Sequence, residues 1–310
     1  MNIFSLLSTM PGAIAQGLIW GIMAIGVYIT YKILDIADLT VDGSICTGGA
    51  VCVMMMMRGH GIAISLLAAV AAGMLAGLVT GLFHTLMGIP AILAGILTQL
   101  ALYSINLKIM GRANQALGVR NFKVLISLQY LKGVPWYQNT LFIISIFVIV
   151  LIAILYWFFG TELGCSLRAT GCNINMSRAQ GINTNFNKIL GLMFSNGIVA
   201  LSGALLTQYQ GFADVQMGRG AIVIGLAAVI IGEAIIGRHF RNFAMQLVSV
   251  AIGGIIYYIV YQTVIWLGID TDLLKMLSAL VVALFLGIPY WKSHFKKNTV
   301  KTTEGGKENA

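Results

Sequence analysis

The chain has 310 residues, of which 58% are hydrophobic and only 9% are charged. Soluble domains carry about 25% charged residues, so this composition excludes a soluble globular protein and indicates an integral membrane protein. Its apolar runs have the length of helices rather than of short alternating strands, which excludes an outer-membrane barrel and predicts an all-α fold. The net charge of +9 comes from cations in loops and in the C-terminal tail, where they set membrane orientation. We therefore expect no nucleic-acid partner.

The apolar runs predict about nine transmembrane helices. They lie at 12–31, 43–57, 61–83, 89–107, 140–159, 189–209, 218–236, 243–267 and 273–291. Pro11 suits the first turn of the first helix, and the N-terminus lacks the basic region and cleavage site of a signal peptide. Residues 1–291 would then form one membrane domain. The Lys-rich residues 292–310 would form a basic cytoplasmic tail without fixed structure.

The longest polar interruption lies between two uncharged apolar runs and covers residues 161–188. It carries Arg168, Arg178 and Lys188 against the single acidic residue Glu162. Positive charge near the ends of membrane helices marks the cytoplasmic side. This loop is therefore predicted to lie in the cytosol.

Within this loop the sequence predicts one short helix over 174–180. Asn173 can cap its start, and Gly181 suits the left-handed residue that ends it. A short capped helix between two membrane helices is typical of a docking element for a cytosolic partner. A plain connecting loop is the alternative.

The two short apolar segments, 43–57 and 218–236, decide the topology. If both cross the membrane, the N-terminus lies outside, and the loop, Arg238–Arg241 and the tail all lie in the cytosol. If both were re-entrant, a cytosolic tail would place the loop outside, against its charge. The five cations of 108–132 would face outward in the crossing arrangement, which counts against it.

The crossing arrangement also contains an internal repeat, at about 12–110 and about 189–291. Each half has one helix, a Gly-rich short segment and two further helices. An odd number of passages separates the halves, so they are inverted relative to each other. Inverted repeats with interrupted helices place a transport pathway between them but do not indicate the energy source.

Asp38 and Asp42 precede the first short segment and are candidates for the translocation pathway. At a spacing of four residues they would share one face of a helix. They could cap or line a broken helix near the pathway. Alternatively, Asp42 simply caps the helix that starts at Gly43.

Three further polar residues within apolar runs are candidates for the same pathway. Glu233 could line the pathway or form a local ion pair with Arg238. Asn196 and Gln208, on 189–209, could line it or bond a neighbouring helix. The four cysteines form no C-x-x-C pair, so we expect them to be packing residues and expect no metal site.

The loop resembles a known family at nine positions. The matching residues are Gly164, Arg168, Ala169, Gly171, Asn173, Ala179, Gly181, Ile182 and Asn183. They make the loop similar to the cytoplasmic loop of bacterial ABC-importer permeases of the branched-chain amino acid and ribose class. The segments IADLTVDGS, ALSGALLTQYQGFADVQMG and IVIGLAAVIIGE resemble the same class. The resemblance is closest to a subgroup paired with lipoprotein-type binding proteins, some of which carry aromatic amino acids.

The resemblance implies a multi-pass permease subunit of a prokaryotic cytoplasmic membrane, normally a dimer. Separate ABC ATPase subunits would bind ATP and Mg and dock on the 162–188 loop, while an external binding protein delivers a small solute, with an aromatic amino acid favoured. The implied ATPase-coupling residues are Arg168, Gly171, Asn173, Met176, Arg178, Ala179 and Gly181. No G-x-x-x-x-G-K-[ST] phosphate loop occurs, so this chain is expected to be neither an ATPase nor a cofactor-binding enzyme. A secondary transporter driven by an ion gradient, or a channel or scaffold, are the alternatives.

Overall fold

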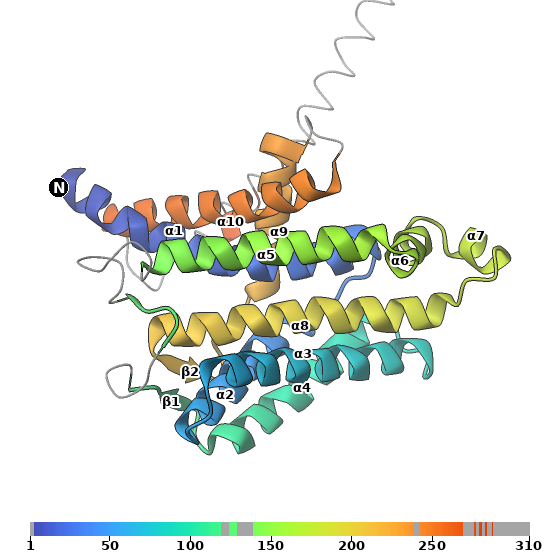
Figure 1. The fold of residues 1–310 in the computed structure, drawn as a ribbon, viewed down its shortest axis with the longest axis horizontal. Coiled ribbons are helices and arrows are strands. Elements are labelled where there is room, and N and C mark those ends of the chain that lie inside the picture. The colour runs from blue at the N-terminus through green and yellow to red at the C-terminus, as the bar shows by residue number, and fades with distance from the viewer. Residues whose placement is uncertain are drawn as a thin grey trace, which may run out of the picture.

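The computed structural model describes residues 3–118, 124–128, 139–237 and 242–268, together with residues 276, 279, 280, 283 and 287. Long helices run along its longest axis (Figure 1). The helices are α1 (Ile3–Tyr28), α2 (Val41–Met57), α3 (Ile62–Thr85), α4 (Ala91–Met110), α5 (Thr140–Gly160), α6 (Glu162–Cys172), α7 (Ile174–Ala179), α8 (Thr184–Gln210), α9 (Ala221–Gly232) and α10 (Phe243–Trp266). Short π-helices, Ile29–Ile33 and Glu233–Gly237, continue α1 and α9.

The all-α membrane fold is confirmed. Among the described residues, six helices are long and apolar enough to cross a membrane, and Val41–Met57 and Ala221–Ile236 are shorter apolar helices. Eight of the expected passages therefore correspond to helices. The ninth, 273–291, and the tail 292–310 lie almost wholly outside the described residues, so the count of nine stays a prediction. The first helix begins at Ile3 and holds Pro11 in its interior, not in its first turn.

The two ends of the bundle differ in structure. At one end, β1 (Asn114–Ala116) pairs antiparallel with β2 (Phe212–Asp214), which joins the segments that follow α4 and α8. At the other end lie α6 and α7, on the right in Figure 1. We call these the sheet end and the α7 end.

Helices α1 and α8 lie antiparallel along the centre of the bundle. Three hydroxyl groups of α8 donate hydrogen bonds to backbone carbonyls of α1. The pairs are Ser195 to Gly26 (2.8 Å), Ser202 to Ile19 (2.7 Å) and Tyr209 to Gly12 (3.3 Å). From one bond to the next, the donor lies seven residues later in α8 and the acceptor seven residues earlier in α1. The contact therefore repeats every two helical turns. Hydroxyl-to-carbonyl bonds of this kind satisfy polar side chains between packed membrane helices.

The two halves pack on each other in the same way. Helix α3 of the first half lies against α8, where Gly77 meets the backbone at Leu192. Helix α10 of the second half lies against α1, where a Cβ on Gly17 would be 2.7 Å from the Cα of Ile255. The third helix of each half (α3 or α10) therefore packs against the first helix of the other half (α8 or α1). This is the packing expected of inverted repeats, although the limits 12–110 and 189–291 stay predictions.

The short helices α2 and α9 begin beside each other and end at different places. Asp42, in the first turn of α2, accepts hydrogen bonds from the first turn of α9. Helix α2 ends near the sheet, where Gln115 contacts Met57, and α9 ends at the α7 end beside Lys32. The non-helical residues 34–40 and 215–220 precede the two helices. Because both helices are shorter than the six candidate membrane spans, the crossing arrangement and its re-entrant alternative both stay predictions.

The non-helical approaches to α2 and α9 share one local structure. The Oδ1 atom of Asp38 accepts from the backbone N–H of Thr40 at 2.9 Å. The Oδ1 atom of Asp214 accepts from the backbone N–H of Gln216 at 2.6 Å. Both aspartates follow an alanine, and each bonds the backbone of the residue two positions on, which forms an Asx turn. The same turn therefore precedes both short helices, as the predicted internal repeat would require.

Candidate functional site

The connection between α5 and α8 has the caps that the sequence predicts. The Asn173 side chain accepts from the backbone N–H of Met176 at 3.0 Å, which starts α7. Gly181 has φ +80°, in the left-handed region, just after α7 ends. One helix was not anticipated, because α6 precedes α7 and is capped by the hydroxyl of Thr161. Its sequence signal is Thr161 followed by an amphipathic turn with buried Leu167.

Buried polar contacts fix α6 and α7 to the start of α8. Asn187 of α8 is buried, and its Nδ2 donates to the hydroxyls of Thr170 (2.9 Å) and Ser166 (3.2 Å) of α6. The Nε of Arg178 in α7 donates to the hydroxyl of Thr184 at 3.0 Å. Because a buried amide is costly to leave without partners, these contacts hold the connection in one geometry.

The tip of the α7 end exposes apolar side chains. In α7, Met176 is 55% exposed and Ile174 is 36% exposed, and Phe186 in the first turn of α8 is 51% exposed. Arg178 and Ala179 are also exposed. Exposed apolar residues gathered with a basic residue on a rigid, capped helix are typical of a protein-docking surface. We call Ile174, Met176, Arg178, Ala179 and Phe186 the α7 tip.

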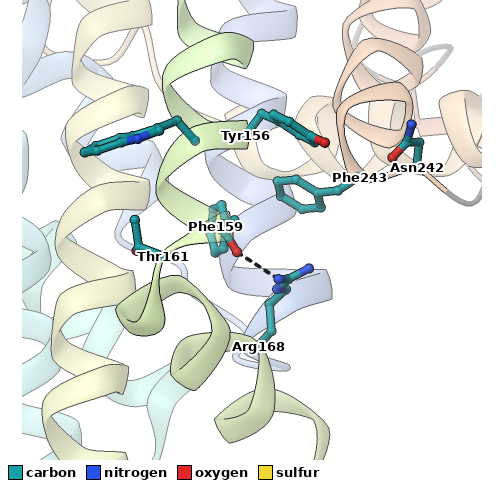
Figure 2. Close-up of a pocket in the computed structure, with 8 residues that line it drawn as sticks. Tyr156, Phe159, Thr161, Arg168, Asn242 and Phe243 are labelled. Atoms are coloured by element: carbon teal, nitrogen blue, oxygen red, sulfur yellow. Dashed lines mark hydrogen bonds between the residues drawn. The ribbon is translucent and has the colours of Figure 1, made fainter.

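Two of the expected coupling residues face the permease body instead of this tip. Arg168 donates to the backbone carbonyl of Phe159 at 2.8 Å and lies 5.8 Å from the ring centroid of Phe243 (Figure 2). A Cβ on Gly171 would overlap the carbonyl of Ile33, so this glycine lets α6 rest against the end of the π-helix that follows α1. Of the expected coupling set, Asn173, Met176, Arg178, Ala179 and Gly181 lie at or next to the tip.

Two of the expected pathway residues meet in the core. The Nδ2 of Asn196 in α8 donates to Asp38 at 2.7 Å, and the Ser44 hydroxyl of α2 donates to the Oδ1 of Asn196 at 2.6 Å. All three side chains are buried. Asp38 is not in a helix, so the expected shared helix face with Asp42 is wrong; the Asx turn at Asp38 precedes α2.

A chain of threonines continues this buried cluster. The hydroxyls of Thr40 and Thr80 lie 2.7 Å apart, and Thr80 donates to Thr98 at 2.9 Å. They join the segment 34–40 to α3 and α4. Sequence reasoning missed these threonines and Ser44, although isolated hydroxyl residues inside apolar runs are the signal that would have found them.

Asp42 has a different role from the expected one. Helix α2 begins at Val41 after Thr40, so Asp42 lies inside the first turn and does not cap the helix from the outside. Its carboxylate accepts from the backbone N–H groups of Gly220 and Ile222, both at 3.0 Å, and so caps α9. The interpretation of Asp42 as the cap of its own helix is wrong, because the free N–H groups of α9 lie opposite its side chain.

The other two pathway candidates lie apart from this cluster. Gln208 accepts from the backbone N–H of Leu125 at 3.1 Å, near the sheet end. Glu233 forms an ion pair with Lys32 at 3.1 Å, at the α7 end. The expected partner, Arg238, lies outside the described residues. In the described part of the chain, no three His, Cys, Asp or Glu residues are placed to hold a metal ion.

Comparison with known proteins agrees with the fold and the motifs. Residues 10–287 match the family model described as "Branched-chain amino acid transport system / permease component". The tyrosine transport system permease protein of Clostridioides difficile is 37% identical over 95% of this chain and 96% of its own length. The autoinducer 2 import permease LsrC of Yersinia pestis is 32% identical over 74% of this chain and 63% of its own length.

A solved structure shows the same fold. PsaBC from Streptococcus pneumoniae, in complex with a Fab, covers 93% of this chain and 95% of its own with a TM-score of 0.53 at 16% identity. At that identity the similarity concerns the fold alone. The helices, the loop motif and the family match together give the identity: this chain belongs to the branched-chain amino acid transport system permease family and is a multi-pass ABC-import permease of a prokaryotic cell membrane.

Proposed function

We propose that this chain is the permease subunit of an ATP-driven importer and that a separate ATPase subunit docks on the α7 tip. The single observation that carries this proposal is the construction of α7. It is short, capped by Asn173, ended by Gly181 and tied to α8, yet it exposes Ile174 and Met176 at the end of the molecule. A surface that receives force must be exposed on one side and rigidly held on the other.

Helix α8 supplies the route from this tip to the interior. Asn187 holds α6, and Asn196, nine residues further along α8, holds Asp38 and Ser44. At 1.5 Å per residue the two amides are about 13 Å apart along one rigid helix. A displacement of α7 therefore moves the segment 34–40 and the start of α2.

The meeting point of α2 and α9 is the part of the pathway that this movement would change. In transporters built from inverted repeats, interrupted helices place their N-termini at the substrate path. Here the N-terminus of α9 is closed by the carboxylate of Asp42. We place Asp38, Asp42 and Asn196 beside the pathway. Gln208 and Glu233 lie toward its two ends.

The solute that we propose is an amino acid, with an aromatic side chain favoured. The support is the 37% identity to a permease named for tyrosine transport and the resemblance of the loop to that subgroup. An external binding lipoprotein would deliver the solute. A second permease copy would complete the pore, and the partner ATPase would bind ATP and Mg.

Changing Met176→Glu tests the docking surface. A charge placed among apolar contacts is expected to abolish co-purification of the partner ATPase and to reduce tyrosine uptake at least about tenfold, because buried interface charges without partners cost several kcal/mol. The matched control is Met87→Glu, which changes another exposed methionine (67% exposed) at the same end.

Retained ATPase binding in Met176→Glu, at the wild-type level, would contradict docking on α7.

The energy source is tested in the wild-type strain. Uptake is expected to continue when the membrane potential is collapsed and ATP is maintained. Uptake that stops under those conditions would support the ion-gradient alternative.

A further inference from the structure

A cavity of about 620 Å³ opens between α5, α6 and α10. Its wall contains Tyr156, Trp157 and Phe159 from the end of α5, Arg168 from α6, and Asn242 and Phe243 at the start of α10. Figure 2 shows the guanidinium of Arg168 and the rings of Tyr156 and Phe243 around this space. None of the residues that line this cavity belongs to the α7 tip.

Arg168 gives the cavity a positive charge. Its Nη2 group donates to the carbonyl of Phe159 and to the Sγ of Cys165, and its other N–H groups make no hydrogen bond to the described residues. None of the described residues that line the cavity is Asp or Glu. Asn242, on the opposite side, makes no capping bond to α10 through its side chain. The described lining of the cavity therefore offers donors to an anion and no carboxylate to a cation.

The surroundings of the cavity favour a lipid. Tyr156 is 52% exposed and Trp157 is 72% exposed, and aromatic residues of these types concentrate where a membrane helix reaches the headgroup layer. Further along α5, Ile149 and Ile154 are exposed and apolar. A ligand whose anionic head lies at Arg168 could place acyl chains along this face.

A zwitterionic amino acid fits less well. Its carboxylate could bind Arg168, but its ammonium group would find no acidic side chain in the described lining. A phosphodiester needs only donors. Basic pockets between helices at the cytoplasmic side bind anionic headgroups on the same principle.

We propose that this cavity binds the phosphate of an anionic phospholipid from the cytosolic leaflet, such as phosphatidylglycerol. The bound headgroup bridges Arg168 of α6 and Asn242 of α10. It thereby links the connection that carries α7 to the second half of the permease. Binding of the lipid does not depend on which solute is carried or on where the ATPase docks.

Native mass spectrometry of the purified full-length permease, with added phosphatidylglycerol or phosphatidylcholine, tests the site. Wild type is expected to retain phosphatidylglycerol preferentially. Arg168→Gln is expected to weaken that retention about fivefold, since one basic residue is removed from an anionic-lipid contact. Arg58→Gln, which removes one charge from an exposed residue after α2, is the matched control and is expected to retain the lipid.

A second variant keeps the test independent of folding. Asn242→Asp leaves the bond between Arg168 and Phe159 intact and adds a negative charge to the cavity, at a position where Asp also suits a helix start. It is expected to lose phosphatidylglycerol while melting like wild type. Retention equal to wild type in both variants, or equal loss in Arg58→Gln, would overturn the proposal. So would dissociation of a permease dimer in Asn242→Asp with lipid retention unchanged, because the cavity would then be a subunit contact.

Discussion

Asn196 is the residue on which the buried polar cluster depends. Its amide donates to Asp38 and accepts from Ser44, so it satisfies one group from the segment 34–40 and one from α2. A carboxylate inside a membrane protein is stable only when donors surround it. An asparagine supplies both a donor and an acceptor, and no apolar residue of similar size could replace it.

Replacing Asn196→Leu should therefore destabilise the permease strongly. It leaves a buried carboxylate and a buried hydroxyl without that partner, at a cost of about 2–4 kcal/mol. A lower thermal unfolding midpoint in detergent is the expected result. Asn185→Leu, at an exposed asparagine in the same helix, should have little effect.

The double exchange Asp38→Asn with Asn196→Asp gives a sharper check. It preserves the bonds among the three side chains, because the new amide at position 38 would donate to the new carboxylate at position 196, and Ser44 would still donate to that carboxylate. We expect the exchange to recover much of the stability lost in Asn196→Asp alone, measured as the thermal unfolding midpoint. No recovery would show that the two side chains do not act as a pair.

Among the elements, α2 and α9 depend on each other for their first turns. The first N–H groups of any helix lack partners within the helix. At the start of α9, the N–H groups of Gly220 and Ile222 donate to the carboxylate of Asp42. Asp42 belongs to α2 and is 178 positions away from Gly220. A single carboxylate therefore joins the interrupted helices of the two halves.

Asp42→Ala should cost about 1–2 kcal/mol, the usual effect of removing a helix cap. Asp42→Asn retains an acceptor and should cost less. Both are measured by thermal unfolding, with Glu162→Ala in the exposed first turn of α6 as the comparison. If Asp42→Ala melts at the wild-type temperature, this contact contributes nothing to holding the halves together.

At the scale of the whole molecule, orientation follows from the position of the basic loop. The α7 end carries Arg168, Arg178 and Lys188, so we place it in the cytosol and the sheet end outside. Native cysteines can report this, because Cys165 and Cys172 are exposed in α6 while Cys46 and Cys52 are buried.

A membrane-impermeant maleimide applied to intact cells should leave the wild-type protein unlabelled. Labelling of Cys165 and Cys172 is expected only after permeabilisation. The variant His60→Cys, at an exposed position between α2 and α3, should be labelled in intact cells. Labelling of the native cysteines in intact cells would place α7 outside and exclude ATPase docking there.

The sequence by itself determined the membrane class, the positions of eight helices, the interrupted pair and the caps of α7. Each depends on short-range physics. Apolar length predicts a membrane helix, and Asn173 and Gly181 act on backbone groups within three residues of themselves.

Only the tertiary structure decided which polar groups meet. Asp38 bonds Asn196 across 158 positions, and Lys32 pairs with Glu233 across 201. A polar residue in an apolar run must find a partner, but many distant groups could serve. The packing of α1, α2 and α3 against α8, and of α9 against α1, selects among them. For this reason the expected pairing of Glu233 and the expected cap role of Asp42 could not be settled from neighbouring residues.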